Sequence, residues 1–233
     1  MEHKIIRLKI TASLGDTSNT VYPTLLWDDS NIVLVDCGFT GSLPSIEQQL
    51  HLHGLSVNRL TGLVLTHHDH DHMGAAAALK RLNPNIKIYA SQQEAPYISA
   101  QEKPLRLKQA EELQKRLPPD QQDFGRAFCE MLRQVEPVFV DEFLHDGERF
   151  NWCGGCRIIA TPGHTPGHIS LYIENDSIII TGDALALEDG RPVIANPQFT
   201  LDLKQAEISM NKLLSLKANA YYCYHGGVYA NAN

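Results

Sequence analysis

The sequence predicts a layered α/β fold with a helical insertion, and three observations support this class. Strand-like runs occur in both halves of the 233-residue chain, and segments with helical spacing follow them. Between the halves, residues 92–134 have apolar side chains three or four positions apart and no strand pattern. Hydrophobic residues make up 43% of the chain, enough for a core of its own. We therefore expect one domain over residues 1–233, with sheets and helices packed in layers.

In the first half, short runs of β-branched and apolar residues predict strands. They cover residues 5–10, 21–27, 32–36, 60–66 and 86–90, and Asp28-Asp29-Ser30-Asn31 predicts a turn. A helix is expected over residues 42–53, because Leu43, Ile46 and Leu50 share one face and Gly54 follows. A second helix is expected over residues 73–82, where alanines dominate and Asn-Pro follows.

The insertion, residues 92–134, predicts two or three amphipathic helices that are interrupted at Pro118-Pro119-Asp120. Its larger apolar residues either line a substrate pocket or pack the helices onto the domain, and they are Tyr97, Phe124, Phe128 and Met131. Strands are expected again over residues 137–140, 156–160, 168–173 and 177–181, with a hairpin turn at 174–176. A last helix over residues 203–216 and a strand over 220–224 complete the prediction.

Composition and charge restrict the class of partner. The net charge of −7 argues against a general nucleic-acid binder, which usually has a basic surface. Residues 1–10 alternate apolar and charged side chains and lack the apolar run of a signal peptide, and no segment is long enough to span a bilayer. We expect a soluble, cytoplasmic protein that acts on a small molecule and binds neither nucleic acid nor membrane. The oligomeric state is not predicted.

The five cysteines are scattered and odd in number, unlike a disulfide framework. Cys153 and Cys156, in Trp-Cys-Gly-Gly-Cys, have the spacing of a thioredoxin-type redox motif. A strand-like run follows directly, so we expect Gly154 and Gly155 to form a tight turn between strands, and no redox role.

Ligand-type side chains gather in four short segments, each at the end of a predicted strand. The segments are 66–72 (Thr-His-His-Asp-His-Asp-His), 161–168 (Thr-Pro-Gly-His-Thr-Pro-Gly-His), 181–183 (Thr-Gly-Asp) and 224–227 (Tyr-His-Gly-Gly). Loops at sheet edges commonly carry functional groups, and such a combination favours a metal site. In an extended chain, the side chains of residues 67, 69 and 71 would lie on one side and those of 68, 70 and 72 on the other. The spacing alone therefore allows two different sets of ligands.

These segments, in this order, resemble the metallo-β-lactamase superfamily, in particular its glyoxalase II and N-acyl homoserine lactonase-like branch. Asp36-Cys37-Gly38 and the first strands also fit this family. The resemblance implies a four-layered αβ/βα sandwich with two metal ions between its sheets. It also implies that residues 92–134 lie where the family often has a lid or substrate-binding helices.

Matched position by position, the resemblance implies seven metal ligands. His67, Asp69 and His164 would hold the first ion, and Asp71, His72 and His225 the second, with Asp183 bridging them. Asp69 is a departure, because the family usually has histidine there, and ligation by His70 in its place is an alternative. If Asp69 is the ligand, His68 and His70 lie next to the site without binding an ion. His168 has a structural role.

The aspartate at position 69 changes the charge of the site. Two divalent ions, three aspartates and a bridging hydroxide are neutral together, whereas a histidine there would leave one positive charge. We expect two divalent ions, zinc first, with manganese or iron acceptable at the Asp69 position, where carboxylate favours harder ions and easier metal exchange.

The resemblance implies a hydrolase in which a metal-bridging hydroxide attacks an ester, lactone or thioester carbonyl, with Asp71 orienting or relaying a proton. Two alternatives remain. One is a diiron redox protein that acts with a separate partner, since flavo-diiron members have a carboxylate at the second ligand position. The other is a phosphodiesterase for a small nucleotide.

Overall fold

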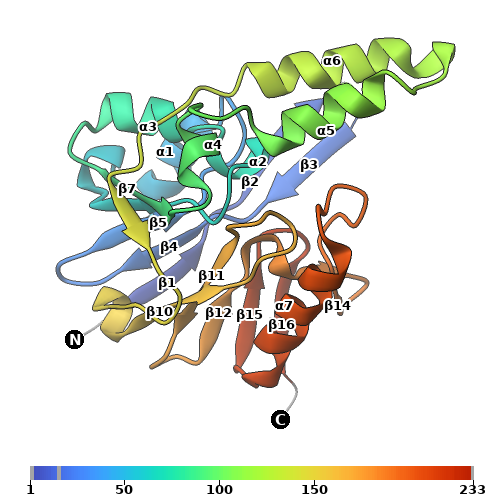
Figure 1. Ribbon diagram of the computed structural model, residues 1–233. Coiled ribbons are helices and arrows are strands. Elements are labelled where there is room, and N and C mark those ends of the chain that lie inside the picture. Colours follow the sequence, from blue (N-terminus) through green and yellow to red (C-terminus); the bar gives the residue numbers. More distant parts are fainter. Residues whose placement is uncertain (1–2, 15–16, 232–233) are drawn as a thin grey trace.

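The computed structural model describes residues 3–14 and 17–231, and its main strands form two six-stranded sheets (Figure 1). The first sheet contains, in spatial order, β1 (Lys4–Arg7), β4 (Thr24–Trp27), β5 (Ile32–Val35), β6 (Gly62–Val64), β7 (Lys87–Ser91) and β8 (Glu142–Leu144). The second contains β16 (Gly227–Ala230), β15 (Ala220–Cys223), β12 (Ile178–Ile180), β11 (Ile169–Ile173), β10 (Cys156–Ala160) and β9 (Arg149–Phe150). Separate hairpins pair β2 (Ile10–Leu14) with β3 (Thr17–Val21), and β13 (Ala186–Glu188) with β14 (Arg191–Val193).

Helices cover the outer face of each sheet (Figure 1). On the first sheet lie α1 (Leu43–His51), α2 (His70–Met73), α3 (Ala76–Leu82) and α4 (Ala95–Ile98); on the second lies α7 (Leu203–Ser215). Short 3-10 turns occur at η1 (Val57–Arg59), η2 (Pro119–Gln121), η3 (Trp152–Gly154) and η4 (Gly182–Ala184). The layers are therefore helix, sheet, sheet and helix, and the predicted αβ/βα sandwich is confirmed.

Strand side chains alternate between two apolar layers, as the period of two requires. In β5, Leu34 packs with Ile46 and Leu50 of α1, while Val33 and Val35 face the second sheet. The same division occurs in the second sheet, where one face packs on the first sheet and the other on α7. Burial on both faces explains why these strands are continuous apolar runs in the sequence.

One predicted strand, residues 137–140, is wrong. Val138 and Val140 are buried and Phe139 is 68% exposed, which is the alternation of a strand. These residues are not part of a strand, however, and the Val138 N–H donates to the carbonyl of Ile98 in α4 (3.1 Å). The strand β8 begins later, at Glu142.

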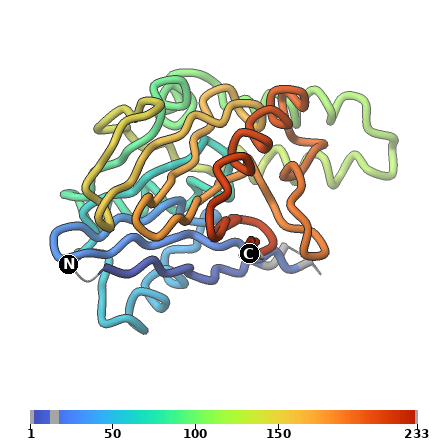
Figure 2. Tube along the Cα trace, turned by 90° about the horizontal axis from the view of Figure 1, so that it is seen from below, coloured from blue at the N-terminus to red at the C-terminus, as the bar shows by residue number. Residues whose placement is uncertain are grey.

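The insertion forms a helical hairpin that extends beyond the sandwich in both views (Figures 1 and 2). It consists of α5 (Leu105–Gln114) and α6 (Gln122–Arg133), and residues 92–134 contain no strand, as predicted. The hairpin has an apolar cluster of its own: Leu107, Ala110, Cys129 and Leu132. A Cβ on Gly125 would lie 1.8 Å from Gln114 Oε1, so α5 and α6 approach closely there.

The Trp-Cys-Gly-Gly-Cys segment connects β9 to β10, as the turn prediction stated. Gly154 (φ +77°) and Gly155 (φ +143°) adopt left-handed backbone conformations that favour glycine. Cys153 and Cys156 are buried free thiols, and burial raises the pKa of Cys153 to about 12. This environment does not favour the thiolate that redox chemistry needs. No helix in the described part of the chain has the length and apolarity to cross a bilayer.

Candidate metal centre

The ligand-type segments meet at one edge of the sandwich because each follows the carboxyl end of a strand. β10, β11 and β12 alternate in direction, and β12 is parallel to β15, so β10, β12 and β15 all end at the same edge. The loops after these strands carry His164, Asp183 and His225, and the loop after β6 carries His67 and Asp69. Topology thus brings together residues that are distant in the chain.

The first predicted group is compact and buried. His67 Nε2 lies 3.5 Å from Asp69 Oδ2, and His164 Nε2 lies 3.1 Å from the same oxygen. All three residues are at most 4% exposed. They form one of the groups of side chains that can hold an ion.

The second predicted group lies beside the first and is more open to solvent. His225 Nε2 lies 3.3 Å from Asp71 Oδ2, and the two side chains are 24% and 14% exposed. With the buried His72, they also form a group that can hold an ion.

Asp183 lies between the two groups. Its Oδ1 is 3.2 Å from His72 Nε2 and 3.4 Å from His225 Nε2, and its Oδ2 is 3.4 Å from His164 Nε2. Each carboxylate oxygen thus faces a different group, which is the arrangement that a bridging ligand needs. Burial alone would raise the pKa of Asp183, but the neighbouring His225, His72 and His164 hold it well below the usual range.

Hydrogen bonds fix the histidine rings with Nδ1 outward and Nε2 toward the centre. The Thr66 hydroxyl donates to Asp36 (2.8 Å), so His67 Nδ1–H donates to the Thr66 oxygen (3.0 Å). The Thr200 hydroxyl donates to the carbonyl of Ala195, so His164 Nδ1–H donates to Thr200 (3.2 Å). These tautomers leave the Nε2 lone pairs directed at the centre.

The donor atoms fit divalent ions. Ligand bonds of about 2.0–2.1 Å in a tetrahedral site separate neighbouring donor atoms by about 3.3–3.4 Å. The distances between nitrogen and carboxylate oxygen here are 3.1 to 3.5 Å. Several of these buried atoms have no hydrogen-bond partner: His67 Nε2, His72 Nε2, His225 Nε2 and Asp183 Oδ1. Imidazole nitrogens and carboxylate oxygens that converge on one buried point are stabilised by a cation placed between them.

Asp36 is a functional residue that motif reading did not assign. It is fully buried and accepts hydrogen bonds of 2.8 Å from the Thr66 N–H, the Thr66 hydroxyl and His72 Nδ1. A carboxylate on the outer nitrogen of a ligating histidine fixes the ring and makes it a better donor. The sequence signal was an aspartate directly after the apolar run 32–35.

The extended geometry assumed for residues 66–72 is wrong beyond Asp69. The helix α2 begins at His70, so the side chains of Asp71 and His72 do not alternate as they would in a strand. Both belong to the second group, together with His225. His70 is turned toward the aromatic side chains of Phe39 and Phe128, at ring distances of 6.0 and 6.1 Å. The structure therefore places Asp69, and not His70, in the first group.

His168 has the structural role that was predicted for it. Its Nδ1–H donates to the Thr161 hydroxyl (2.8 Å), and its Nε2 accepts from the N–H of Asp183 (2.9 Å). A Cβ on Gly182 would lie 2.6 Å from His168 Nε2, so glycine lets the ring reach this amide. His168 thereby holds the backbone of the Asp183 loop.

His68 connects the centre to the insertion. The ring is buried and pairs through Nδ1 with Glu94, and the Leu105 N–H at the start of α5 donates to Nε2 (3.2 Å). Tyr97 packs on the ring at 4.8 Å. This residue therefore supports the loop that carries the ligands and the helix that covers it.

Arg106 of α5 is the second residue that motif reading did not assign. Its guanidinium contacts Asp69 Oδ2 through Nη2 (2.6 Å) and Nε (3.1 Å), and the side chain is 4% exposed. Burial alone would raise the pKa of Asp69, but Arg106 holds it well below its usual range. The sum of charges that made the site neutral in the sequence analysis did not include the positive charge of Arg106.

For two of the larger apolar residues of the insertion, the structure shows packing within the hairpin: Phe128 and Met131 both contact its apolar cluster. The Phe128 ring also lies 5.9 Å from the ring of Phe199 and 6.1 Å from that of His70. Phe124 stacks on Phe128 at 6.5 Å and remains 68% exposed.

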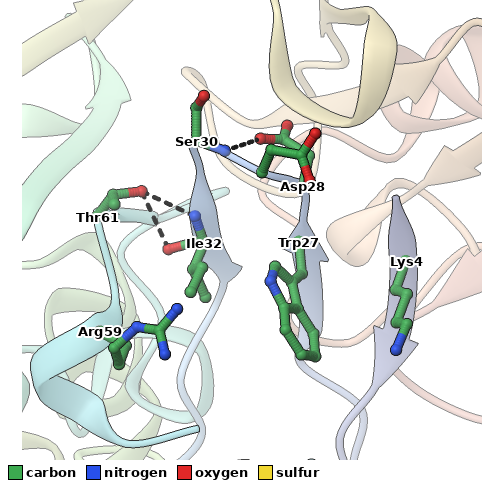
Figure 3. A pocket seen from close by; sticks show the side chains of 8 residues that line it. Lys4, Trp27, Asp28, Ser30, Ile32, Arg59 and Thr61 are labelled. Atoms are coloured by element: carbon green, nitrogen blue, oxygen red, sulfur yellow. Dashed lines mark hydrogen bonds between the residues drawn. The ribbon is translucent and has the colours of Figure 1, made fainter. Parts of the chain in front are cut away.

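A surface pocket of about 500 Å³ lies away from this centre (Figure 3). Lys4, Trp27 and Asp28 line it at the turn that precedes β5, whereas Asp36 follows the other end of that strand. The Asp28 carboxylate there accepts from the N–H of Ser30 (2.8 Å), which stabilises the turn.

Comparison with known proteins agrees with this geometry. The metallo-β-lactamase superfamily matches residues 17–225. The probable metallo-hydrolase YflN of Bacillus subtilis (strain 168) is 28% identical over 222 residues, which cover 90% of this chain and 80% of that protein. The hydroxyacylglutathione hydrolase GloC of Haemophilus influenzae is 30% identical over 165 residues, 70% of this chain and 65% of GloC.

A solved structure shows the same fold. The metallo-β-lactamase family protein of Thermus thermophilus has a TM-score of 0.75 at 25% identity, over 97% of this chain and 74% of that one. The family match covers all the residues that form the centre, from Asp36 to His225. This chain belongs to the metallo-β-lactamase superfamily of metal-dependent hydrolases.

Proposed function

We propose that the chain is a dinuclear metal-dependent hydrolase that acts on an ester, lactone or thioester carbonyl of a small molecule. The observation that carries the proposal is the convergence of buried imidazole Nε2 atoms and carboxylate oxygens with Asp183 between two groups. Zinc suits a donor set of imidazole nitrogens and carboxylate oxygens, and the carboxylate of Asp69 makes the first position acceptable to manganese or iron.

The residues have separate roles in this proposal. The first ion would be held by His67, Asp69 and His164, and the second by Asp71, His72 and His225. Asp183 would contact both ions. When bound, the two ions supply a water activated for attack near neutral pH and polarise the scissile carbonyl. No protein nucleophile is required.

Asp71 is suited to orient or accept a proton during the reaction. Its Oδ2 faces His225, while Oδ1 lies 3.5 Å from His70 Nδ1 at the more open side of the centre. The Tyr224 hydroxyl donates to the Asp71 carbonyl and accepts from the Gly38 N–H (3.0 Å), which holds this backbone in place.

Thioesters are the first substrates to test, because GloC is named for a glutathione thioester. Metal-depleted protein, reloaded with Zn²⁺ or Mn²⁺, is assayed against a hydroxyacylglutathione, p-nitrophenyl esters, simple lactones and bis-p-nitrophenyl phosphate. We expect metal-dependent turnover of at least one carbonyl class, at a kcat/KM of about 10⁴ M⁻¹s⁻¹ or more for a good substrate. The same protein with a chelator is the control.

Two results would contradict the proposal. Turnover of the phosphodiester alone would favour phosphoryl chemistry. Tightly bound iron with a visible absorption band that responds to reductant, together with no hydrolysis, would favour the diiron redox alternative.

A further inference from the structure

The two halves of the metal centre differ in their contact with positive charge. Arg106 lies against the first group, on the ligands Asp69 and His164. In the described part of the chain, Asp71 and Asp183 form ion pairs only with histidines. The sequence offers no reason for this asymmetry, because Arg106 is 37 positions from Asp69.

The guanidinium contacts the very atoms that an ion in the first position would use. Asp69 Oδ2, the oxygen that faces His67 and His164, accepts from both Nε and Nη2 of Arg106. Nη2 also lies 3.2 Å from His164 Nε2. A neutral imidazole nitrogen has one lone pair, so it cannot accept from Arg106 and bind an ion at the same time.

We infer that Arg106 competes with the ion of the first position and makes the two positions unequal. The second position, with Asp71, His72 and His225, binds its ion first and more tightly. The first fills only when the guanidinium withdraws from His164 and shares Asp69 with the ion. This inference rests on the proposed metal site and is independent of the substrate.

Electrostatics support the same order. A guanidinium near a divalent ion opposes its binding, because like charges repel more strongly in a buried site than in bulk water. Without the ion, the same guanidinium stabilises the buried carboxylate of Asp69, which would otherwise be costly to ionise.

Withdrawal of Arg106 also affects the insertion. Its Nη1 contacts the side chain of Gln109 and the carbonyl of Phe199, and the guanidinium lies 5.0 Å from the Phe199 ring centroid. Binding of the first-position ion should therefore loosen α5 and the segment around Phe199, so occupancy is coupled to the part of the fold that covers the centre.

The test is a zinc titration of metal-depleted full-length protein against a chromophoric chelator, on the wild type, R106Q and R126Q. Arg126 is the matched control, because it lies on α6 of the same hairpin, is 61% exposed and pairs with Asp123. We expect one tight and one weaker ion in the wild type. R106Q should tighten the weaker ion by about tenfold or more and change the tighter one little, and R126Q should match the wild type.

Hydrogen exchange on the wild type alone provides a second test if R106Q folds poorly. Amides of residues 105–114 should be unchanged by the first equivalent of zinc and exchange faster after the second. Equal affinities in the wild type, a weaker first position in R106Q, or unchanged exchange after the second equivalent would each overturn the inference. Failure of the wild type to bind any zinc would instead overturn the proposed function.

Discussion

Replacement of Asp183 with alanine is expected to lower kcat/KM for the best carbonyl substrate by about a thousandfold or more. Its two oxygens face His72 and His225 on one side and His164 on the other, so the variant removes a ligand from both positions. The bound zinc should fall from two ions to one or fewer per chain at equal metal concentration. Steady-state kinetics and elemental analysis of the same samples measure both effects.

The control for this variant is Asp189→Ala, because Asp189 is an exposed aspartate in the β13–β14 hairpin, close in sequence to Asp183. It should retain wild-type activity and zinc. Asp183→Asn preserves the shape of the side chain and separates loss of charge from loss of packing. Near-normal activity in a correctly folded Asp183→Ala protein would show that this residue does not bridge two ions.

Replacement of Asp36 with alanine is expected to lower the free energy of unfolding of the metal-free protein by about 3 kcal/mol or more. The variant leaves the Thr66 N–H, the Thr66 hydroxyl and His72 Nδ1 without their buried acceptor. Because His72 also loses its orientation, zinc affinity should fall by about 10- to 100-fold. Urea unfolding and chelator competition measure the two effects separately.

Asp36→Asn is the informative comparison. With its amide oxygen in the place of Oδ1, the side chain still accepts from the Thr66 N–H. The amide nitrogen in the place of Oδ2 cannot accept from the Thr66 hydroxyl or from His72 Nδ1. We expect part of the stability to return while zinc affinity remains low. A variant with alanine whose stability and zinc affinity both stay at wild-type values would rule out the supporting role of Asp36.

The layers of the fold and the four ligand-bearing loops were predictable because their signals are local. The runs over residues 32–36 and 168–173, for example, predicted strands, and each histidine or aspartate segment followed such a run directly. The strand expected at 137–140 failed for a non-local reason. Its side chains do alternate between buried and exposed, but a strand also needs hydrogen bonds to a second strand. The segments that could supply those bonds are distant in the sequence, so the local pattern does not reveal whether they are in reach.

The contribution of Arg106 could not be predicted from the sequence. The sequence around Arg106 does not distinguish this residue from Arg116 or Arg126. Only the folding of the insertion over the centre brings Arg106 to Asp69. With this cation included, the site that was counted as neutral carries one positive charge, the value expected with histidine at position 69. The prediction of easier metal exchange at the first position stays a prediction, and competition by Arg106 is now an additional physical reason for it.

The most direct test of the dinuclear centre is native mass spectrometry of the metal-depleted wild type during a zinc titration. At low zinc we predict a species with one ion, and at saturation a species with two ions per chain and no higher specific stoichiometry. Binding that stops at one ion even at saturating zinc would contradict the two-ion centre and the hydrolytic function proposed from it.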